Sequence, residues 1–384
     1  MDFELSMEQE ILRRTVRSFA EKEIAPVARE LDEKEEFSLD TCRAMGELGL
    51  FGMVVSEEYG GQEMDYISYI IAVEEIARID GSHAATVAAG NSLGIGPLYY
   101  YASEEQKKKY LPKLCTGQHL WGFGLTEPNA GSDAGGARTT AVLDGNEWVL
   151  NGSKIFITNA SAPNSLGVTV MARTGTRDDG RGPELSCILV EHGTKGFEAK
   201  EMHGKMMWRA SNTSELYFDD CRVPKENLLG QQGKGFHQML ETLDAGRLSI
   251  GAMGLGGAQG AYEQAMRYSR EREQFGRPIS SFQANAFKLA DMAMEIEAAR
   301  LLLYKACWQK DHHKPFGKLA AMGKLYCSEV MGRVVDEAVQ LHGGYGLMKE
   351  YNVERFYRDQ KLLTIGEGTS EIQRLVIARL IGAI

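Results

Sequence analysis

The sequence has no pair of cysteines in a CxxC arrangement, although six cysteines are spread along its 384 residues. This absence argues against a zinc knuckle and a redox dithiol, and it predicts buried thiols in a reducing compartment. The sequence also lacks an apolar run long enough to cross a bilayer. Its formal net charge of −10 is the opposite of the basic surface with which proteins wrap nucleic acid. We therefore expect no metal site, no nucleic acid and no membrane insertion.

The first residues, MDFELSMEQEILRRTVRSF, are charged and amphipathic and lack the apolar centre of a signal peptide. We therefore expect a cytoplasmic protein, or a mitochondrial matrix protein if the chain is a processed eukaryotic form. Apolar residues make up 43% and charged residues 25% of the chain. This is the balance of an ordinary folded protein with room for two or three domains.

Three zones of different periodicity divide the sequence. Residues 1–120 follow the helical period. Residues 121–230 contain short alternating stretches separated by turn residues, including the hairpin signal Asp144-Gly145. Long helical periods return in residues 231–384. We predict three domains with these boundaries, in the order helical, β, helical.

The predicted fold is a multi-domain α+β protein. Its parts are an N-terminal helical domain, a central β-barrel or β-sandwich, and a C-terminal four-helix bundle that includes the last helix. One long helix is expected over residues 8–31, and Ser103 with Gln106 has the spacing of a capping box. Residues 251–261 are rich in Gly and Ala, which predicts close approach of a neighbouring backbone.

Several polar stretches could bind a ligand, and each also has an ordinary structural explanation. The Gly-rich segment 121–137 could cradle a phosphate with its N–H groups, or be only a loop. Asp244 and Arg247 share a helix face, as a surface ion pair would. Arg272 could hold a pyrophosphate or oppose a helix dipole. A left-handed glycine cap explains QLHGGYG, residues 340–346, with a structural histidine.

One carboxylate has an unusual setting. Glu367 stands between Gly366 and Gly368, directly before a predicted helix in which Ser370 and Gln373 have the spacing of a capping box. Taken alone, this is most simply an acidic residue that favours a helix N-terminus.

Seven motifs in order along essentially the whole chain resemble the acyl-CoA dehydrogenase family, closest in look to its short-chain, butyryl-type members. They are LTEPNAGSDAG, LNGSKIFITNA, FDDCRVPKENLLG, LDAGR, SREREQFGRPISSFQ, QLHGGYG and YRDQKLLTIGEGTSEIQRLVIARLI. The resemblance implies the three-domain fold, bound FAD, and oxidation of an acyl-CoA thioester to the 2,3-enoyl-CoA. It also implies a homotetramer built as a dimer of dimers, and transfer of electrons to an electron-transferring flavoprotein.

By this resemblance Glu367 is the catalytic base. It abstracts the α-proton while N5 of FAD takes the β-hydride, and flanking glycines leave room for thioester and flavin. Removal of so weak an acid requires a positioned base, and desolvation strengthens a carboxylate for this task. Some relatives, notably isovaleryl-type enzymes, carry the base on the earlier LDAGR helix. The corresponding position here is Gly246, which cannot serve.

The resemblance implies roles for other residues as well. Implied flavin contacts on the central domain are Phe123, Leu125, Thr126, Ser132, Phe156 and Thr158, of which Phe156 and Thr158 share a face of the predicted strand KIFITNA. Implied contacts at the last helix are Thr369 and Glu371. Implied contacts to the FAD of a neighbouring subunit are Arg272, Gln283, Gln340, Leu341, Gly343 and Gly344, with Phe275 as a further cofactor position. Implied substrate contacts are Ser132, Asp244, Arg247 and Gly368.

Three departures from the family pattern concern the flavin and the acyl group. Phe156 stands where many relatives have Trp, Gly366 stands where short- and medium-chain enzymes usually have Tyr, and KMMWRASNTSEL replaces a pattern with Gly-Ile-Arg-Gly. A missing ring at Gly366 predicts a wider pocket. A branched, cyclic, aryl-bearing or carboxyl-bearing acyl group, including a glutaryl type that decarboxylates, is therefore an alternative to butyryl.

Two other functions stay open on the sequence. One is an acyl-CoA oxidase that reacts with O₂, and the other is a non-catalytic protein that binds flavin or CoA only structurally. Monooxygenase relatives typically lack the late carboxylate, so Glu367 counts against that activity.

Overall fold

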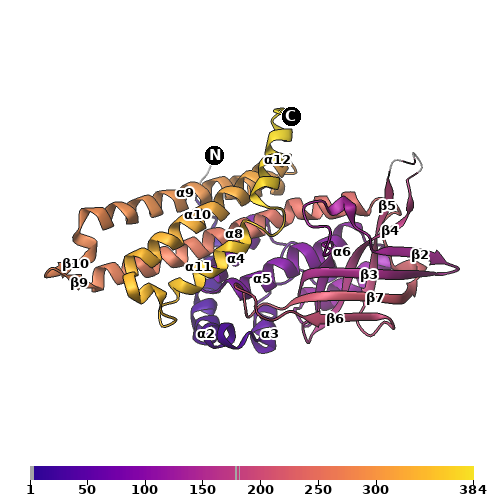
Figure 1. The fold of residues 1–384 in the computed structure, drawn as a ribbon, viewed down its shortest axis with the longest axis horizontal. Coiled ribbons are helices and arrows are strands. Elements are labelled where there is room, and N and C mark those ends of the chain that lie inside the picture. Colours follow the sequence, from indigo (N-terminus) through magenta and orange to yellow (C-terminus); the bar gives the residue numbers. More distant parts are fainter. Residues whose placement is uncertain (1–3, 178–179, 181) are drawn as a thin grey trace.

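The computed structural model describes residues 4–177, 180 and 182–384. Helices, strands and helices follow one another along the chain. Strands β1 to β8 gather at one end of an elongated molecule, and the short pair β9 and β10 lies at the other end (Figure 1). The three-part fold predicted from the sequence is confirmed.

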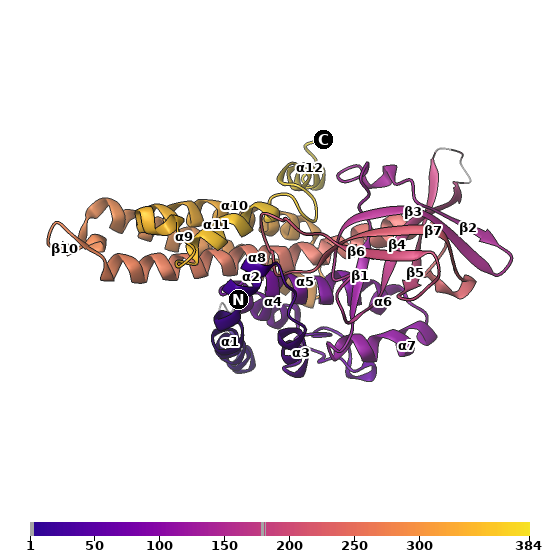
Figure 2. The same cartoon turned by 60° about the horizontal axis from the view of Figure 1, so that its bottom comes forward.

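The N-terminal part consists of helices packed beneath the rest of the molecule (Figure 2). The predicted first helix exists, interrupted by one π turn, and the predicted capping box of α7 is present at Ser103 and Gln106. Helix α4 is buried along nearly its whole length. The elements are α1 (Met7–Phe19), a π turn (Ala20–Ile24), α2 (Ala25–Lys34), α3 (Leu39–Glu47), α4 (Tyr66–Ala77), α5 (Gly81–Ala89), a π turn (Gly90–Ile95), α6 (Gly96–Tyr101) and α7 (Glu104–Cys115).

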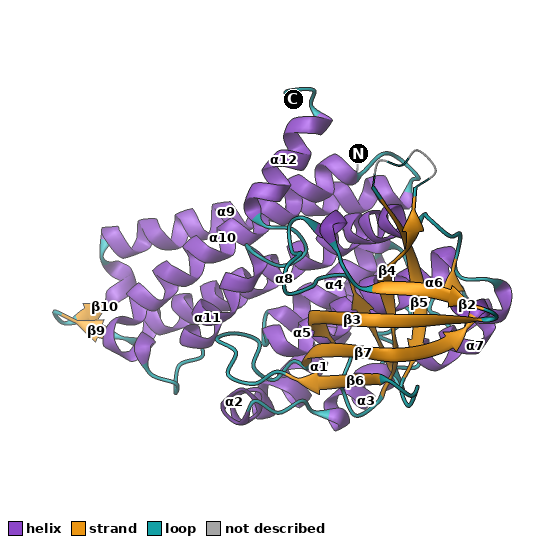
Figure 3. Cartoon of the chain, turned by 45° about the vertical axis from the view of Figure 1, so that its right-hand side comes forward, coloured by secondary structure: helices purple, strands orange, loops and turns teal. Residues whose placement is uncertain are grey.

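The central part is one eight-stranded sheet with a core of its own, seen from its open face in Figure 3. Strand order is β6-β7-β3-β2-β4-β5-β8, and β1 pairs in parallel with β4. The predicted hairpin is confirmed, since Asp144 pairs with Glu147 and Gly145 takes a φ of 62°. The strands are β1 (Leu120–Gly124), β2 (Thr140–Asp144), β3 (Glu147–Thr158), β4 (Ser165–Thr176), β5 (Pro183–Glu191), β6 (Phe197–Glu201), β7 (Thr213–Pro224) and β8 (Leu228–Leu229).

The C-terminal part is a bundle of long helices. Helices α8, α9, α10 and α11 run side by side, whereas α12 packs on α10 and projects away from the bundle (Figure 1). From the sequence we predicted that the last helix is the fourth helix of the bundle, whereas in the structure the fourth helix is α11 (Figure 1). The elements are α8 (Gly235–Glu271), β9 (Glu273–Gln274), β10 (Arg277–Pro278), α9 (Gln283–Asp311), α10 (Gly317–His342), α11 (Val353–Leu363) and α12 (Ser370–Leu380).

Glycines on α8 bring α4 close, as the Gly-rich stretch predicted. A Cβ added at Gly256 would overlap the carbonyl oxygen of Glu74, and one at Gly260 would overlap the carbonyl oxygen of Arg78. The two helix backbones therefore meet without side chains between them, which fixes the N-terminal helices on the bundle.

The six cysteines are free and buried, as predicted. Within the described residues, no helix is long and apolar enough to span a membrane.

Replacement of Gly260 by Ala tests this contact. Because the new methyl group would meet backbone that cannot move aside, we expect Gly260→Ala to lower the free energy of unfolding by about 1–3 kcal/mol in urea titrations. Gly332→Ala is the matched control, since its methyl group would meet only the side-chain Oε1 of Gln360, 3.3 Å away. An equal effect of both substitutions would contradict the close approach.

Candidate active site

The Glu367 carboxylate lies over a bare stretch of helix α8. Glu367 belongs to the loop between α11 and α12, and a Cβ added at Gly246 would overlap its Oε2 atom. That atom is buried and makes no hydrogen bond within the described part of the chain. The carboxylate therefore reaches this position only because residue 246 has no side chain. Gly246 stands at the position where some relatives carry their base, and in this chain it is the surface on which the Glu367 carboxylate rests.

The Glu367 carboxyl is ionisable close to neutral pH. Burial raises its pKa from the usual 4.5 to about 7, while the positive charges of Lys324 and Arg247 act to lower it. A base whose pKa lies near the working pH transfers protons most effectively. Desolvation thus makes this carboxylate a stronger base than a solvated one.

The backbone at Glu367 is strained. Its φ is 51°, a conformation that costs a non-glycine residue about 1–3 kcal/mol, and Gly368 follows with a φ of 90°. The buried amide of Gln373 donates to the carbonyls of Glu367 at 3.0 Å and Gly368 at 3.1 Å. The surroundings therefore hold the carboxylate in place through its own main chain.

The predicted capping box at the start of α12 is wrong. Thr369 is the N-cap, and its side chain accepts a hydrogen bond from the Ile372 N–H at 3.2 Å. Gln373 does not return to the cap, because its amide is used on the two carbonyls before it. Ser370 is buried as the first residue of the helix. The helix itself was predicted correctly, but its N-cap is Thr369, one residue before the predicted Ser370.

Asp244 and Arg247 form an ion pair on α8, but it is not a surface pair. Arg247 is 6% exposed, donates from one Nη to Asp244, and faces Glu367 as a positive charge. Burial raises the pKa of the Asp244 carboxyl. The surface interpretation is wrong for Arg247, which is buried, whereas the Asp244 side chain keeps 37% exposure.

A pocket of about 410 Å³ reaches Ala245, the residue before Gly246, although Glu367 itself does not line it. Ala245, the neighbour of Gly246, lines it together with Asp244 and with Tyr69, whose pKa is raised by burial and by the charge of Glu367. Further tyrosines contribute most of its aromatic wall, namely Tyr66, Tyr99, Tyr100 and Tyr101. Our sequence analysis missed this wall, although the run LYYYAS was a visible signal.

A buried ion pair shapes the Gly-rich loop after β1. Lys154 is 1% exposed, and its Nζ lies 2.8 Å from Glu127 and 3.1 Å from the Leu125 carbonyl oxygen. Glu127 in turn accepts from the N–H groups of Arg138 at 2.6 Å and Thr139 at 3.0 Å. The loop is thus tied at both ends to one carboxylate, which the sequence analysis did not identify.

The predicted flavin contacts of the β-domain differ in exposure. Phe123 and Leu125 are buried, so contact there would come from their backbone, whereas Thr126 is partly exposed and Ser132 exposed. Phe156 sits at a β-bulge with a φ of 61° and is 62% exposed.

The bulge means that strand KIFITNA does not alternate regularly. Ile157 is buried at 3%, as expected for the opposite face, but the ladder to β7 shifts between Lys154 and Ile157. Thr158 is half-buried and pairs with Thr213. The bulge turns the Phe156 ring outward, because an extra residue re-aims a side chain.

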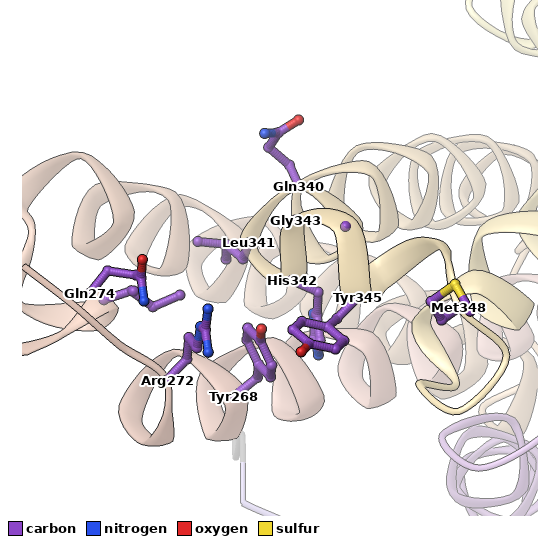
Figure 4. A pocket seen from close by; sticks show the side chains of 11 residues that line it. Tyr268, Arg272, Gln274, Gln340, Leu341, His342, Gly343, Tyr345 and Met348 are labelled. Carbon is purple, nitrogen blue, oxygen red and sulfur yellow. The ribbon is translucent and has the colours of Figure 1, made fainter.

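A second pocket, of about 620 Å³, lies at the far end of the bundle (Figure 4). It brings together five predicted residues: Arg272, Gln340, Leu341, Gly343 and Gly344. Within the described chain, Arg272 has no carboxylate within 4.0 Å. Phe275 lies outside the pocket, at the tip of the β9–β10 hairpin with 93% exposure, and exposed Gln283 starts α9.

The QLHGGYG segment ends α10 differently from the prediction. Gly343 has a positive φ of 61°, but its ψ of −139° lies outside the left-handed helical region. His342 is structural, as expected: it is buried, lies 2.8 Å from the Ala338 carbonyl oxygen and stacks on Tyr268 at 4.3 Å. Burial lowers the pKa of its imidazole.

Comparison with known proteins covers nearly the whole chain. Three family descriptions match it in order: "Acyl-CoA dehydrogenase, N-terminal domain" at residues 6–118, "middle domain" at 122–221 and "C-terminal domain" at 233–382. The chain therefore belongs to the acyl-CoA dehydrogenase family, whose members are FAD-dependent oxidoreductases.

Similar proteins share its length as well as its fold. "Probable acyl-CoA dehydrogenase YngJ" of Bacillus subtilis is 53% identical over 99% of both chains. The butyryl-CoA dehydrogenase of Megasphaera elsdenii is 43% identical, with a TM-score of 0.95 over 99% of this chain and 100% of that one. A chain in a structure described as "Electron transferring flavoprotein of Acidaminococcus fermentans" is 45% identical, with a TM-score of 0.96 over 99% of both.

A methyl group at residue 246 should displace the Glu367 carboxylate. We expect Gly246→Ala to lower kcat/KM for the best acyl-CoA substrate by about 100-fold, because a shift of about 1 Å in a reacting group has that effect. Gly251→Ala on the same helix is the control, since its methyl group would meet the end of the Leu303 side chain at 2.8 Å and the Gly323 carbonyl carbon at 3.7 Å, but not Glu367. Unchanged kinetics of Gly246→Ala would show that the carboxylate does not need this surface.

Proposed function

We propose that Glu367 abstracts the α-proton of a short acyl-CoA thioester, which is thereby oxidised to the 2,3-enoyl-CoA. The observation that carries this proposal is the buried, unpartnered Oε2 of Glu367 over Gly246, whose neighbour Ala245 lines a pocket of about 410 Å³. A carboxylate whose buried Oε2 has no hydrogen-bond partner among the described residues, and whose pKa is about 7, can take a proton from carbon. Similarity to a butyryl-CoA dehydrogenase supports a short acyl group.

The residues of this chain fit FAD, which when bound supplies the hydride acceptor. Arg272 lines a pocket of about 620 Å³ as a cation without a carboxylate partner in the described chain, as a pyrophosphate site requires. The Gly343–Gly344 backbone beside it is open, since a Cβ added to either meets nothing within 4 Å. Loop residues Thr126 and Ser132 and the outward Phe156 ring would hold the flavin side.

These two groups of residues lie too far apart to serve one cofactor within one chain. Arg247, which faces Glu367, lies on α8, and Arg272 directly follows the last residue of that helix, so 25 residues, or about 37 Å of helix, separate them. Figure 1 shows the same separation, with the β9–β10 hairpin at one end of the molecule and the sheet at the other. We therefore propose that each FAD is held by two subunits.

An apolar stripe on α9 supports assembly into a homotetramer. Phe287, Met294, Leu301 and Trp308 recur every seven residues along this helix and are 58%, 65%, 47% and 40% exposed. A seven-residue spacing keeps side chains on one face of a helix, which is the pattern of helices that pack on partner helices. A second copy of the chain would cover this face.

For the electron acceptor we propose an electron-transferring flavoprotein. The support is the similarity to the chain in the Acidaminococcus fermentans structure named above. The alternative is an oxidase, in which O₂ takes the electrons. Stopped-flow spectra distinguish them, because in an oxidase the flavin bleached by substrate would regain its colour within turnover time in air.

We also propose the domain boundaries 1–120, 121–230 and 231–384. The first boundary falls after Leu120, the first residue of β1, and the second falls between β8 and α8, so both lie close to where one kind of secondary structure gives way to another. The six buried free thiols fit a reducing compartment, so we propose the cytoplasm as the location.

Replacement of Glu367 by Gln tests the base directly. Because Gln has the same shape but cannot accept the proton, we expect Glu367→Gln to lower kcat by about 10³-fold or more. Anaerobic addition of substrate should then no longer bleach the flavin, although FAD content stays normal. Glu198→Gln, an exposed carboxylate on β6, is the control. Full activity of Glu367→Gln would refute the proposal.

The acyl group can be tested through Gly366. A Cβ there would lie 3.5 Å from the Leu362 carbonyl oxygen, so a side chain is tolerated and none now occupies the space. We expect Gly366→Tyr to lower kcat/KM for branched or aryl-bearing acyl-CoA at least about tenfold more than for butyryl-CoA, since bulk in a pocket discriminates by shape.

Gly366→Ala, as the small control, should leave this ratio unchanged. If the natural protein already prefers butyryl-CoA over every bulky thioester by a wide margin, the wider pocket is refuted. Product analysis with glutaryl-CoA would reveal decarboxylation.

A further inference from the structure

One buried lysine has no explanation in the roles assigned so far. Lys324 lies in the first third of α10, and its side chain is fully buried. Its Nζ donates to the Gly368 carbonyl oxygen at 2.8 Å. Among the described residues, no carboxylate oxygen lies within 4.0 Å of this Nζ. Burial of an ammonium without a paired carboxylate is costly, so its retention points to a task.

The carbonyl to which the Lys324 Nζ donates belongs to the strained loop. Glu367 and Gly368 both have positive φ, and Gly368 is the point where Lys324 and Gln373 converge. The two donors come from different helices, α10 and α12, and both are buried. Two such bonds on one carbonyl over-determine a backbone conformation that would otherwise relax.

The charges around Glu367 come from several elements. Lys324 on α10 and Arg247 on α8 favour its ionised form, and burial opposes it. Tyr69 on α4 also interacts with Glu367. Glu371 on α12 interacts with Lys324, whose own pKa is lowered by burial to about 8. Since Arg247 is paired with Asp244, Lys324 is the facing cation that has no acidic partner within 4.0 Å in the described residues.

We propose that Lys324 is the positioning residue of the base: its ammonium fixes the Gly368 carbonyl, and with it the backbone that aims the Glu367 carboxylate over Gly246, while its charge keeps that carboxylate ionised. This inference rests on the proposed role of Glu367 as base. Lys324 touches neither substrate nor reacting atoms in this account, and acts entirely through Glu367 and its neighbour.

Two substitutions separate the hydrogen bond from the charge. Lys324→Met removes both, whereas Lys324→Gln keeps a donor for the Gly368 carbonyl and removes only the charge. Lys318→Met, an exposed lysine on the same helix, is the matched control. We expect the acid limb of the pH profile of kcat/KM to move up by about one unit in both Lys324 variants, as loss of a nearby opposite charge requires.

The two variants should differ in rate. We expect kcat at the pH optimum to fall by about tenfold or more in Lys324→Met, because the loop loses its anchor and the carboxylate its aim. In Lys324→Gln the retained hydrogen bond should restore most of this loss. Lys318→Met should match the natural protein in both rate and pH profile.

A readout without turnover makes the test independent of chemistry. The titration of the Glu367 carboxyl can be followed in substrate-free holoenzyme through its infrared carbonyl band, identified by difference against Glu367→Gln. We expect its midpoint to rise in both Lys324 variants and to stay unchanged in Lys318→Met.

An unchanged midpoint and pH profile in Lys324→Gln, or in Lys324→Met where it folds, would overturn the inference, whatever the effect on thermal stability. If Glu367→Gln itself kept full activity, the proposed function would fail instead, and the two failures are therefore distinguishable.

Discussion

The site depends on one packing contact, in which the carboxylate of Glu367 rests on helix α8 at a residue without a side chain. The contact removes the carboxylate from water, and it is this loss of hydration that raises its pKa to about 7. The basicity of Glu367 thus results from burial. The surrounding elements hold its carboxylate in place although its backbone is strained and its Oε2 has no hydrogen-bond partner among the described residues. Gly246 and the α11–α12 loop therefore position the carboxylate together.

Helix α8 organises the rest of the molecule around that contact. One part of it carries Asp244, Gly246 and Arg247, its middle accepts α4 at backbone distance, and its far end presents Arg272. The N-terminal helices supply the tyrosine wall of the pocket. Gly256 and Gly260 on α8 allow these helices to pack this close. Because the two ends of α8 are so far apart, the proposed cofactor site needs two copies of the chain.

Two of the predictions that failed at the site have clear physical causes. The cap of α12 was assigned to Ser370 because its spacing to Gln373 is that of a capping box, but Gln373 finds stronger use on the carbonyls of a strained loop. The regular alternation predicted around Phe156 fails because a bulge intervenes. In both cases an interaction outside the short sequence pattern changed the local structure. Such an interaction cannot be predicted from the short pattern alone.

The sequence by itself determined the three zones, the hairpin at Asp144-Gly145, the first cap of α7 and, through the order of its motifs, the family and the candidate base Glu367. These properties are encoded by neighbours along the chain or by short motifs. Only the tertiary structure decided that Gly246 lies beneath Glu367 and that Lys324 holds the loop before α12. These contacts join residues far apart in sequence and depend on how the helices pack against one another. The periodicity of a single helix does not predict that packing.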